Sequence, residues 1–280
     1  AATSPIKYWT QTHMTFNQTT GTLSRHETTD RKLFDRIAGS YCGKDLTPSC
    51  AVARKLRLTQ TIQSTQLPRD AAILEVGCGA GFSAQYLEGR YKRFVGVDYS
   101  QELIRLATHY NDRPGVTFEA KNVHDFSTEE TFDGIFMVGV LHHMEDMTGA
   151  IRDISRLLKP NGVHIANEPQ PANPCIRVAR AIRKKTDLSY SEDQLQLSKS
   201  DLREIFNEGG LVDVQVTPQG LFSTPFAEVP LRPQWLTTYL SRFCCGADRI
   251  IERTAGNMLG PFSWNLIASG KKSPADETCQ

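Results

Sequence analysis

The stretch Ile73–Leu87, which reads ILEVGCGAGFSAQYL, places three glycines directly after a carboxylate. Glu75 comes first, and the glycines stand at positions 77, 79 and 81. Glycines let a ligand approach the backbone closely and accept positive φ angles. An apolar run precedes them and a helical pattern follows, which puts the loop at the carboxyl edge of a sheet, where ligands bind in doubly wound folds. The stretch therefore predicts a ligand site.

The spacing of these glycines does not suit a dinucleotide. A dinucleotide fingerprint has its third glycine five positions after the first, whereas here it comes after four, and Phe82 takes the fingerprint position. Glu75 would repel a pyrophosphate but suits a ligand with ammonium or hydroxyl groups. Asp98 ends the next apolar run and can accept hydrogen bonds from both hydroxyls of a ribose. Together these residues predict a cationic nucleoside that carries an amino-acid arm.

Two adjacent histidines, His142 and His143, follow a later apolar run at the same edge of the sheet. The ordinary pKa of histidine, about 6.5, suits a base at neutral pH. His124 and Glu168 are further candidates for the base. The alternative is that the histidine turn only shapes the floor of the pocket. A metal site made by His142, His143 and Glu145 is not expected, because adjacent histidines on one turn point apart.

Alternating apolar runs and helical patterns are expected to position these residues. A last strand after a long excursion is expected to be antiparallel and inserted beside an existing strand. The sequence thus predicts an α/β fold, a doubly wound, mostly parallel seven-stranded sheet with an antiparallel last strand. The expected strands cover residues 72–77, 93–98, 116–120, 132–141, 163–168, 211–217 and 262–270, with a turn at 160–162.

The remaining segments are expected to flank this sheet. Residues 1–65 are predicted to form an N-terminal arm and lid helices, and residues 66–270 the ligand-binding domain. Insertions at about 170–198 and 220–260 are expected to act as caps, and residues 271–280 to form a disordered tail. The second insertion is rich in aromatic residues and leucines, so it is expected to pack on the sheet and to form a pocket wall.

Composition excludes several classes of protein. The chain has 280 residues, of which 39% are hydrophobic and 22% charged, and its formal net charge is +1. No global field therefore attracts nucleic acid or an anionic membrane. The seven cysteines form no C-x-x-C pair, which predicts neither a zinc site nor a disulfide framework. No stretch reaches the roughly 18 apolar residues of a membrane span, so we expect a soluble, cytoplasmic protein and leave its oligomeric state open.

The motifs together resemble those of class I S-adenosylmethionine-dependent methyltransferases, of the small-molecule, type 11-like group. Glu75–Gly81 (EVGCGAG) is similar to the first motif of that family and Gly96–Ser100 (GVDYS) to the second. Phe132–His143 is similar to the fourth, and Leu157–Val163 to the motif before the fifth strand. The resemblance extends over roughly residues 30–168. It implies S-adenosylmethionine as the cofactor and methyl transfer as the reaction.

The resemblance also implies a set of residues around the cofactor, carried over by position. Asp98 would hold the ribose, and Glu75 would lie near the amino group of the methionine part. Tyr99 would pack against the adenine, and Asn122 would accept a hydrogen bond from the adenine amino group through its amide oxygen. Tyr41 would cover the cofactor, where an aromatic face suits a sulfonium. The other implied contacts are Gly77, Cys78, Gly79, Gly81, Val123 and Val138.

Two motifs that the sequence lacks argue against a nucleic acid as the methyl acceptor. The fourth strand ends in MVGV, not in the Asn/Asp-Pro-Pro-aromatic turn of enzymes that methylate nucleic-acid amino groups, and Pro174-Cys175 follows the fifth strand, unlike the cysteine motif of cytosine C5 enzymes. We therefore expect a small, fairly apolar acceptor, with O-methylation slightly favoured over N- or C-methylation. Two alternatives remain: a cofactor-binding protein without turnover, and another enzyme on a Rossmann-like fold, such as a nicotinamide-dependent oxidoreductase.

One helical pattern carries a basic stripe. Residues 173–185 place Arg177, Arg180 and Lys184 on one helical face. Such a stripe is most often a solvated face. The alternative is attraction to an anionic substrate or to a lipid surface.

Overall fold

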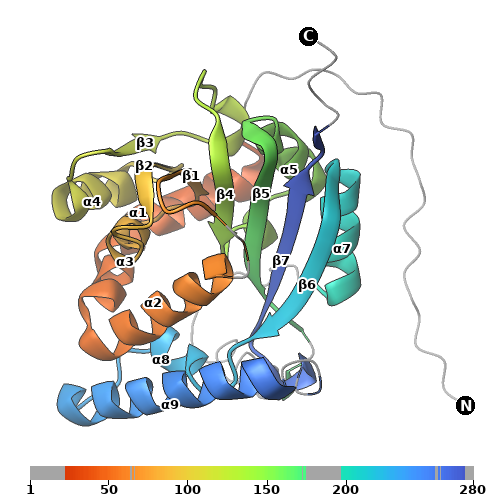
Figure 1. The fold of residues 1–280 in the computed structure, drawn as a ribbon. Coiled ribbons are helices and arrows are strands. Elements are labelled where there is room, and N and C mark those ends of the chain that lie inside the picture. Colours follow the sequence, from red (N-terminus) through yellow and green to blue (C-terminus); the bar gives the residue numbers. More distant parts are fainter. Residues whose placement is uncertain are drawn as a thin grey trace, which may run out of the picture.

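The computed structural model describes residues 23–63, 65, 67–171, 173–174, 197–255, 258 and 260–274. Its centre is a seven-stranded sheet in the order β3-β2-β1-β4-β5-β7-β6 (Figure 1). The strands are β1 (Ala71–Val76), β2 (Tyr91–Asp98), β3 (Val116–Ala120), β4 (Phe132–Val138), β5 (Leu158–Pro169), β6 (Leu211–Gln219) and β7 (Asn265–Lys272). Strand β7 lies between β5 and β6 and is antiparallel to both. This confirms the predicted fold and the inserted last strand.

Helices cover both faces of the sheet (Figure 1). Leu74 and Ile135 pack in the cluster that includes α5 and α7, whereas their chain neighbours Ile73 and Phe136 pack in the cluster that includes α2 and α3. Adjacent residues of a strand face opposite sides of the sheet. A sheet that is covered by helices on both faces therefore has apolar side chains at successive positions. The helices are α1 (Arg25–Leu46), α2 (Pro48–Gln63), α3 (Phe82–Tyr86), α4 (Gln101–Asn111), α5 (Met147–Ser155), α7 (Lys199–Glu208), α8 (Thr224–Glu228) and α9 (Gln234–Ala255), with 3-10 turns η1 (Val123–Asp125), η2 (Leu141–His143) and η3 (Gly260–Phe262).

Helix α1, one of the helices predicted to form a lid, lies beside the glycine loop. It begins with a capping box, in which the side chain of Ser24 accepts a hydrogen bond from the Glu27 N–H and the Glu27 carboxylate accepts one from the Ser24 N–H. Phe34 and Tyr41 of this helix pack in one apolar cluster with Ala80 of the glycine loop. The helix therefore carries aromatic side chains to the edge of the sheet where ligands bind.

Strand β5 begins earlier than expected. The segment predicted as a turn, 160–162, lies inside the strand, where Asn161 has a positive φ of 61°. The pairing of β5 with β4 shifts register at the same place, between Phe132 and Gly134. The turn signal is thus an irregularity within the strand. At the other end of the chain, β7 continues two residues into the segment predicted as a tail, to Lys272.

Helices α8 and α9 pack mainly against α2, and α9 lies alongside α2 in Figure 1. The expectation that the apolar residues of this insertion pack on the sheet is wrong for much of α9, because Trp235, Tyr239 and Phe243 are exposed. Most of the other insertion, with the basic stripe of residues 173–185, lies outside the described residues. In the part of the chain that the structure describes, no helix combines the length and apolar character needed to span a membrane.

Candidate functional site

The loop between β1 and α3 contains three glycines with positive φ angles of 71°, 53° and 72°. A side chain on Gly77 would collide with Val140, and one on Gly81 would collide with Phe118. Gly77 and Gly79 line the main pocket, whereas Gly81 lines neither of the two pockets at this loop. The predicted contact of Gly81 with a ligand is therefore not seen, and its missing side chain instead allows the helix to pack closely on the sheet.

Asp98 ties this loop to the end of β2. Its carboxylate accepts hydrogen bonds from the N–H groups of Gly79 and Ser100, each at 2.9 Å. Burial raises the pKa of Asp98 to about 6, although the two N–H donors act in the opposite direction. The carboxylate also lines the main pocket. It is thus a rigidly held acceptor at the position where a ribose was expected.

The main pocket lies between α1, the glycine loop and the ends of β2 and β4. The space within it, including its open mouth, is about 710 Å³. Sequence reasoning missed Glu27 and Phe34 of the lid and Met144 after η2, which line it too. The predicted residues that line it are Tyr41, Gly77, Gly79, Asp98, Tyr99, Asn122, Val123, Val138 and His143.

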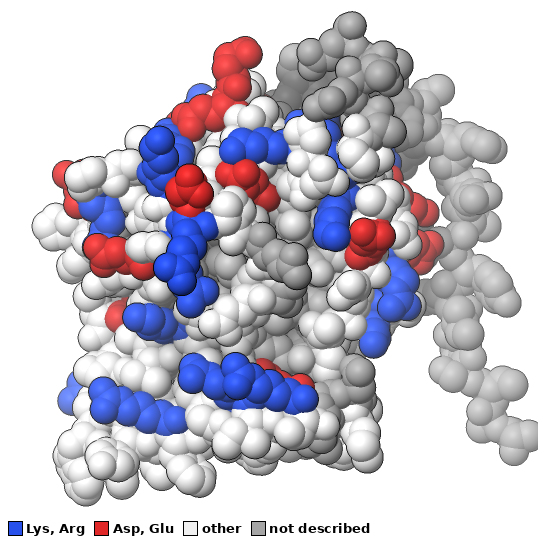
Figure 2. Space-filling model, in the orientation of Figure 1, with Lys and Arg blue, Asp and Glu red and all other residues white. Residues whose placement is uncertain are grey.

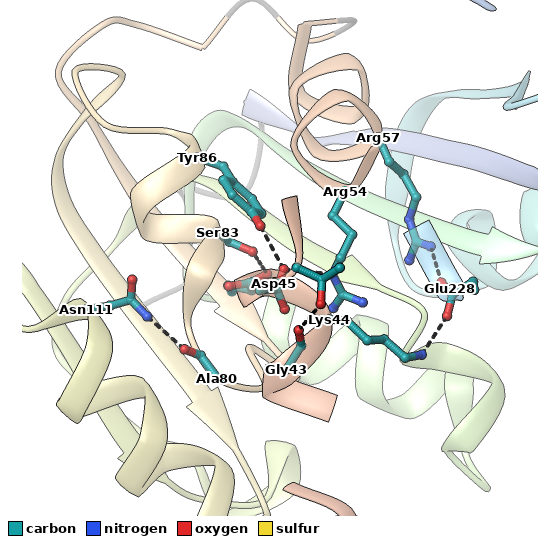
Figure 3. A network of polar contacts seen from close by, with 12 residues as sticks. Gly43, Lys44, Asp45, Arg54, Arg57, Ala80, Ser83, Tyr86, Asn111 and Glu228 are labelled. Atoms are coloured by element: carbon teal, nitrogen blue, oxygen red, sulfur yellow. Dashed lines mark hydrogen bonds and ion pairs between the residues drawn. The ribbon is translucent and has the colours of Figure 1, made fainter. Parts of the chain in front are cut away.

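A second pocket adjoins the first and shares Tyr41 and the glycine loop with it. Cys78 lines this second pocket and not the first. Its polar wall comes from α1 and α2 (Figure 3). There the Asp45 carboxylate accepts hydrogen bonds from Arg54 Nε at 2.8 Å and from the Tyr86 hydroxyl at 2.9 Å.

Beyond Arg54, a second ion pair links α2 to α8. Arg57 lines the second pocket and donates a hydrogen bond to Glu228, 3.1 Å away, which also accepts one from Lys44 at 3.0 Å (Figure 3). Sequence reasoning missed this wall. Two features of the sequence could have indicated it. Tyr41 and Asp45 are one helical turn apart, and Arg54 and Arg57 are three residues apart.

Glu75 lies beneath the glycine loop and lines neither pocket. Its Oε1 accepts a hydrogen bond from the Ser83 hydroxyl at 2.6 Å, and its Oε2 is buried without a hydrogen-bond partner. Burial raises the pKa of Glu75 well above its ordinary value, and the nearby carboxylates of Asp98 and Asp45 raise it further. The predicted contact with a ligand's amino group is thus not part of the pocket wall, which instead carries Asp45 at its polar end.

His143 stands in the main pocket and is held by the lid. Its Nδ1 lies 2.8 Å from Oδ2 of Asp30, and its ring meets Phe34 edge-on at a centroid distance of 5.5 Å. A carboxylate only accepts hydrogen bonds. Nδ1 therefore carries the hydrogen, and Nε2 is left as the acceptor of the ring.

His142 is turned away from the pocket into the protein. Its Nδ1 lies 2.6 Å from Oε2 of Glu168, whose other oxygen accepts the N–H groups of Val140 and Leu141, each at 2.9 Å. Burial alone would raise the pKa of Glu168, but His142 and the two N–H donors outweigh it and the net pKa is lowered. Glu168 is fully buried. Neither His142 nor Glu168 lines the main pocket, so the structure does not favour either as the base. The two side chains instead hold the η2 turn in place.

The other predicted polar residues differ in place or orientation. His124 lines neither pocket and lies 4.0 Å from Asp153. Asn122 turns its amide oxygen to the N–H of His124 at 3.5 Å and leaves its buried amide nitrogen without a partner. The free group offered to a ligand is therefore a donor, not the acceptor that was expected. Among the residues that the structure describes, no cluster of three or more His, Cys, Asp or Glu side chains is arranged to hold a metal ion.

Part of the chain is similar to known methyltransferases. Residues 74–166 match the family model described as a methyltransferase domain. A ubiquinone biosynthesis O-methyltransferase of Xanthomonas axonopodis pv. citri (strain 306) is 30% identical over 99 residues, which are 34% of this chain and 41% of that protein. A demethylmenaquinone methyltransferase of Tropheryma whipplei (strain Twist) is 26% identical over 139 residues, 49% of this chain and 58% of that protein. The chain thus matches about half the length of these curated relatives.

A solved structure from Thermotoga maritima, described as a SAM-dependent methyltransferase and possible histamine N-methyltransferase, has the same fold. The TM-score is 0.60 at 19% identity, and the match covers 86% of this chain and 99% of that one. These matches are to methyltransferases and give no support to the nicotinamide-dependent alternative. Residues 74–166 thus match a methyltransferase domain, and the sheet order and the glycine loop with Asp98 beside it are similar to those of class I S-adenosylmethionine-dependent methyltransferases.

Proposed function

We propose that this chain transfers the methyl group of S-adenosylmethionine to a hydroxyl oxygen of a small, fairly apolar acceptor, with His143 as the general base. The observation that carries the proposal is the pairing of His143 Nδ1 with Asp30 at 2.8 Å, in the wall of the pocket that Asp98 also lines. The pairing fixes the ring and leaves Nε2 to take a proton. The relative named for ubiquinone biosynthesis O-methylation supports an oxygen acceptor.

The residues present fit the cofactor. The sulfonium and the ammonium of the cofactor carry positive charge. Burial raises the pKa values of the Glu75 and Asp98 carboxylates, and a nearby cation would favour their ionised forms. The buried Nδ2 of Asn122, a residue that lines the main pocket, lacks a partner, and such groups are normally satisfied in a complete site. Asp98 would hold the ribose.

The second pocket suits the amino-acid arm of the cofactor. Arg54 would pair with its carboxylate and Asp45 with its ammonium, as charge-assisted hydrogen bonds. Tyr41 lines both pockets, so it would lie beside the sulfonium. This arrangement leaves the part of the main pocket near His143 for the acceptor.

When bound, S-adenosylmethionine supplies a methyl group already activated by its sulfonium. The chain then has to align the acceptor and to exclude water, which the α1 lid does with Phe34. His143 Nε2 takes the hydroxyl proton as the new carbon–oxygen bond forms. The Asp30 carboxylate stabilises the positive charge that develops on the ring. Val140 and Met144 make the adjoining wall apolar, which favours an apolar acceptor.

The proposal is tested by measuring formation of S-adenosylhomocysteine with a panel of acceptors. Phenols and catechols of increasing apolar character are expected to be turned over, whereas amines of the same shape and short oligonucleotides are expected to stay at the acceptor-free rate. Faster turnover of the amines would overturn the oxygen assignment. Tight cofactor binding with no turnover of any acceptor would favour the alternative of a binding protein.

Changing Asp98 to alanine is expected to weaken cofactor binding by about 1–3 kcal/mol, because a charge-assisted acceptor for the ribose is removed. Titration calorimetry with S-adenosylhomocysteine measures this directly. Asp112→Ala removes an exposed carboxylate at the end of α4 and serves as the matched control with unchanged affinity. Equal affinities of the Asp98 variant and the unaltered protein would refute the ribose assignment.

Cofactor binding is expected to release protons near pH 6. Burial raises the folded-state pKa of Asp98 to about 6 from an ordinary 3.8, so the cofactor-free fold keeps a proton that the unfolded chain has lost. Asp98 therefore lowers the free energy of unfolding as pH rises from about 4 to above 6. If the cofactor ionises Asp98 fully, about half a proton leaves per cofactor bound at pH 6, and affinity rises from pH 5 to pH 7. Calorimetry in two buffers of different ionisation enthalpy checks this, and binding without proton release at pH 6 would contradict it.

A further inference from the structure

The outward side of α9 is apolar, although surface helices normally turn this side to their own core. Trp235, Tyr239 and Phe243 recur every four residues and are 75%, 75% and 74% exposed, and Ile250 follows on the same side at 65%. Within the described residues, none of them belongs to a hydrophobic cluster of the protein. We call this surface, which comprises Trp235, Leu236, Tyr239, Leu240, Phe243 and Ile250, the α9 apolar stripe.

The opposite side of α9 fixes the helix to the protein. Ser241 donates a hydrogen bond to the carbonyl of Ser49 at the start of α2, at 2.8 Å. The fully buried Asp248 accepts the N–H of Ser223 at 2.9 Å and its hydroxyl at 2.6 Å. Glu252 accepts the N–H of Gly220 at 2.7 Å. The apolar stripe is therefore held outward by a specific polar interface on its far side.

The acidic and the basic residues of α9 also lie on different sides of the helix. Both acidic residues of the helix, Asp248 and Glu252, point toward the protein, whereas Arg242, Arg249 and Arg253 are exposed. Spacings of seven and four residues put these arginines in one row beside the stripe, and among the described residues none of them forms an ion pair. Figure 2 shows basic side chains next to uncharged surface along the lower edge, where α9 lies.

We propose that the α9 apolar stripe docks on the surface of an anionic lipid membrane, with α9 lying in the plane of the interface. Trp and Tyr side chains favour the boundary between headgroups and acyl chains, and basic residues beside them favour anionic headgroups. The net charge of the whole chain is only +1, so the attraction comes from this local row of arginines. A second copy of the chain fits less well, because a symmetric contact would bring the same arginines of both copies together.

The geometry also relates this surface to the two pockets. Helix α9 packs on α2, and α2 carries Arg54 and Arg57, which line the second pocket. Docking would hold the site one helix away from the lipid surface. The proposal itself rests on α9 alone and stands whichever acceptor the chain methylates.

Flotation with lipid vesicles tests the proposal. The full chain is expected to float with vesicles of phosphatidylcholine mixed with phosphatidylglycerol, and to float less with phosphatidylcholine alone or at high salt. The triple change Trp235→Ser, Tyr239→Ser and Phe243→Ser is expected to reduce binding by about tenfold or more. The double change Arg242→Gln and Arg249→Gln is expected to weaken binding to the anionic vesicles by about fivefold per arginine.

A matched control is Tyr110→Ser, which removes an exposed aromatic residue from α4, away from α9 (Figure 1), and is expected to leave vesicle binding unchanged. Unaltered affinity of each variant for S-adenosylhomocysteine shows that it has folded. Failure of the unaltered protein to bind anionic vesicles would overturn the proposal. So would a dimer, seen by light scattering, that the triple change converts to a monomer, because the stripe would then be covered by a second copy.

Discussion

Replacing His143 with alanine is expected to lower kcat for methyl transfer by a factor of about 10²–10⁴. The change removes the proposed base for the acceptor's proton and leaves the proposed contacts to the cofactor in place. Affinity for S-adenosylhomocysteine is therefore expected to stay within a few fold of the unaltered value. Initial rates of S-adenosylhomocysteine formation and titration calorimetry separate the two effects.

Two further variants sharpen this result. Asp30→Asn weakens the orientation of the His143 ring and is expected to lower kcat less than loss of the ring, with a changed pH–rate profile. His124→Ala removes a histidine outside both pockets and is the matched control with unchanged kcat. A decrease of only a few fold in His143→Ala would mean that this histidine shapes the pocket floor and is not the base.

Replacing Glu168 with alanine is expected to lower the free energy of unfolding by about 3–5 kcal/mol, because it leaves the ring of His142 without its buried partner and two N–H groups unsatisfied. The carboxylate joins the N–H groups of Val140 and Leu141 to the ring of His142. Urea denaturation measures the change. Because the pKa of Glu168 is lowered, its contribution is present above its ordinary pKa and is lost as pH falls through the folded-state value.

The difference between the unaltered protein and Glu168→Ala should therefore shrink in acid. Glu168→Gln keeps an oxygen for the two N–H groups and is expected to be less destabilising. Asp153→Ala, at a half-exposed carboxylate on α5, is the control for loss of a surface charge. A loss below about 1 kcal/mol for Glu168→Ala would show that the turn is held by other contacts.

The sheet could be predicted because its central strands are buried on both faces and read as continuous apolar runs. Residues at strand ends, such as Asp98 and His143, could be placed at one edge for the same reason. The start of α1 within residues 1–65 was not predicted, although Ser24 and Glu27 carry a capping-box pattern, since the surrounding residues are polar and give no apolar period.

Contacts between distant segments could not be predicted from the sequence. His142 and His143 are equivalent in the sequence, and their roles differ because one meets Glu168, 26 residues away, and the other meets Asp30, 113 residues away. The wall formed by Asp45 and Arg54 likewise depends on how two lid helices pack. The aromatic residues and leucines of the 220–260 insertion predicted a packed cap, but composition does not tell which neighbour, if any, covers them.

Asp98 and the glycine loop are proposed to hold an adenosyl group, and a crystal structure with S-adenosylhomocysteine tests this most directly. We expect both ribose hydroxyls on the Asp98 carboxylate, the amino-acid arm beside Asp45 and Arg54, and the sulfur facing the space next to His143. A ligand bound elsewhere, or a pyrophosphate bound in preference at Gly77 and Gly79, would contradict it.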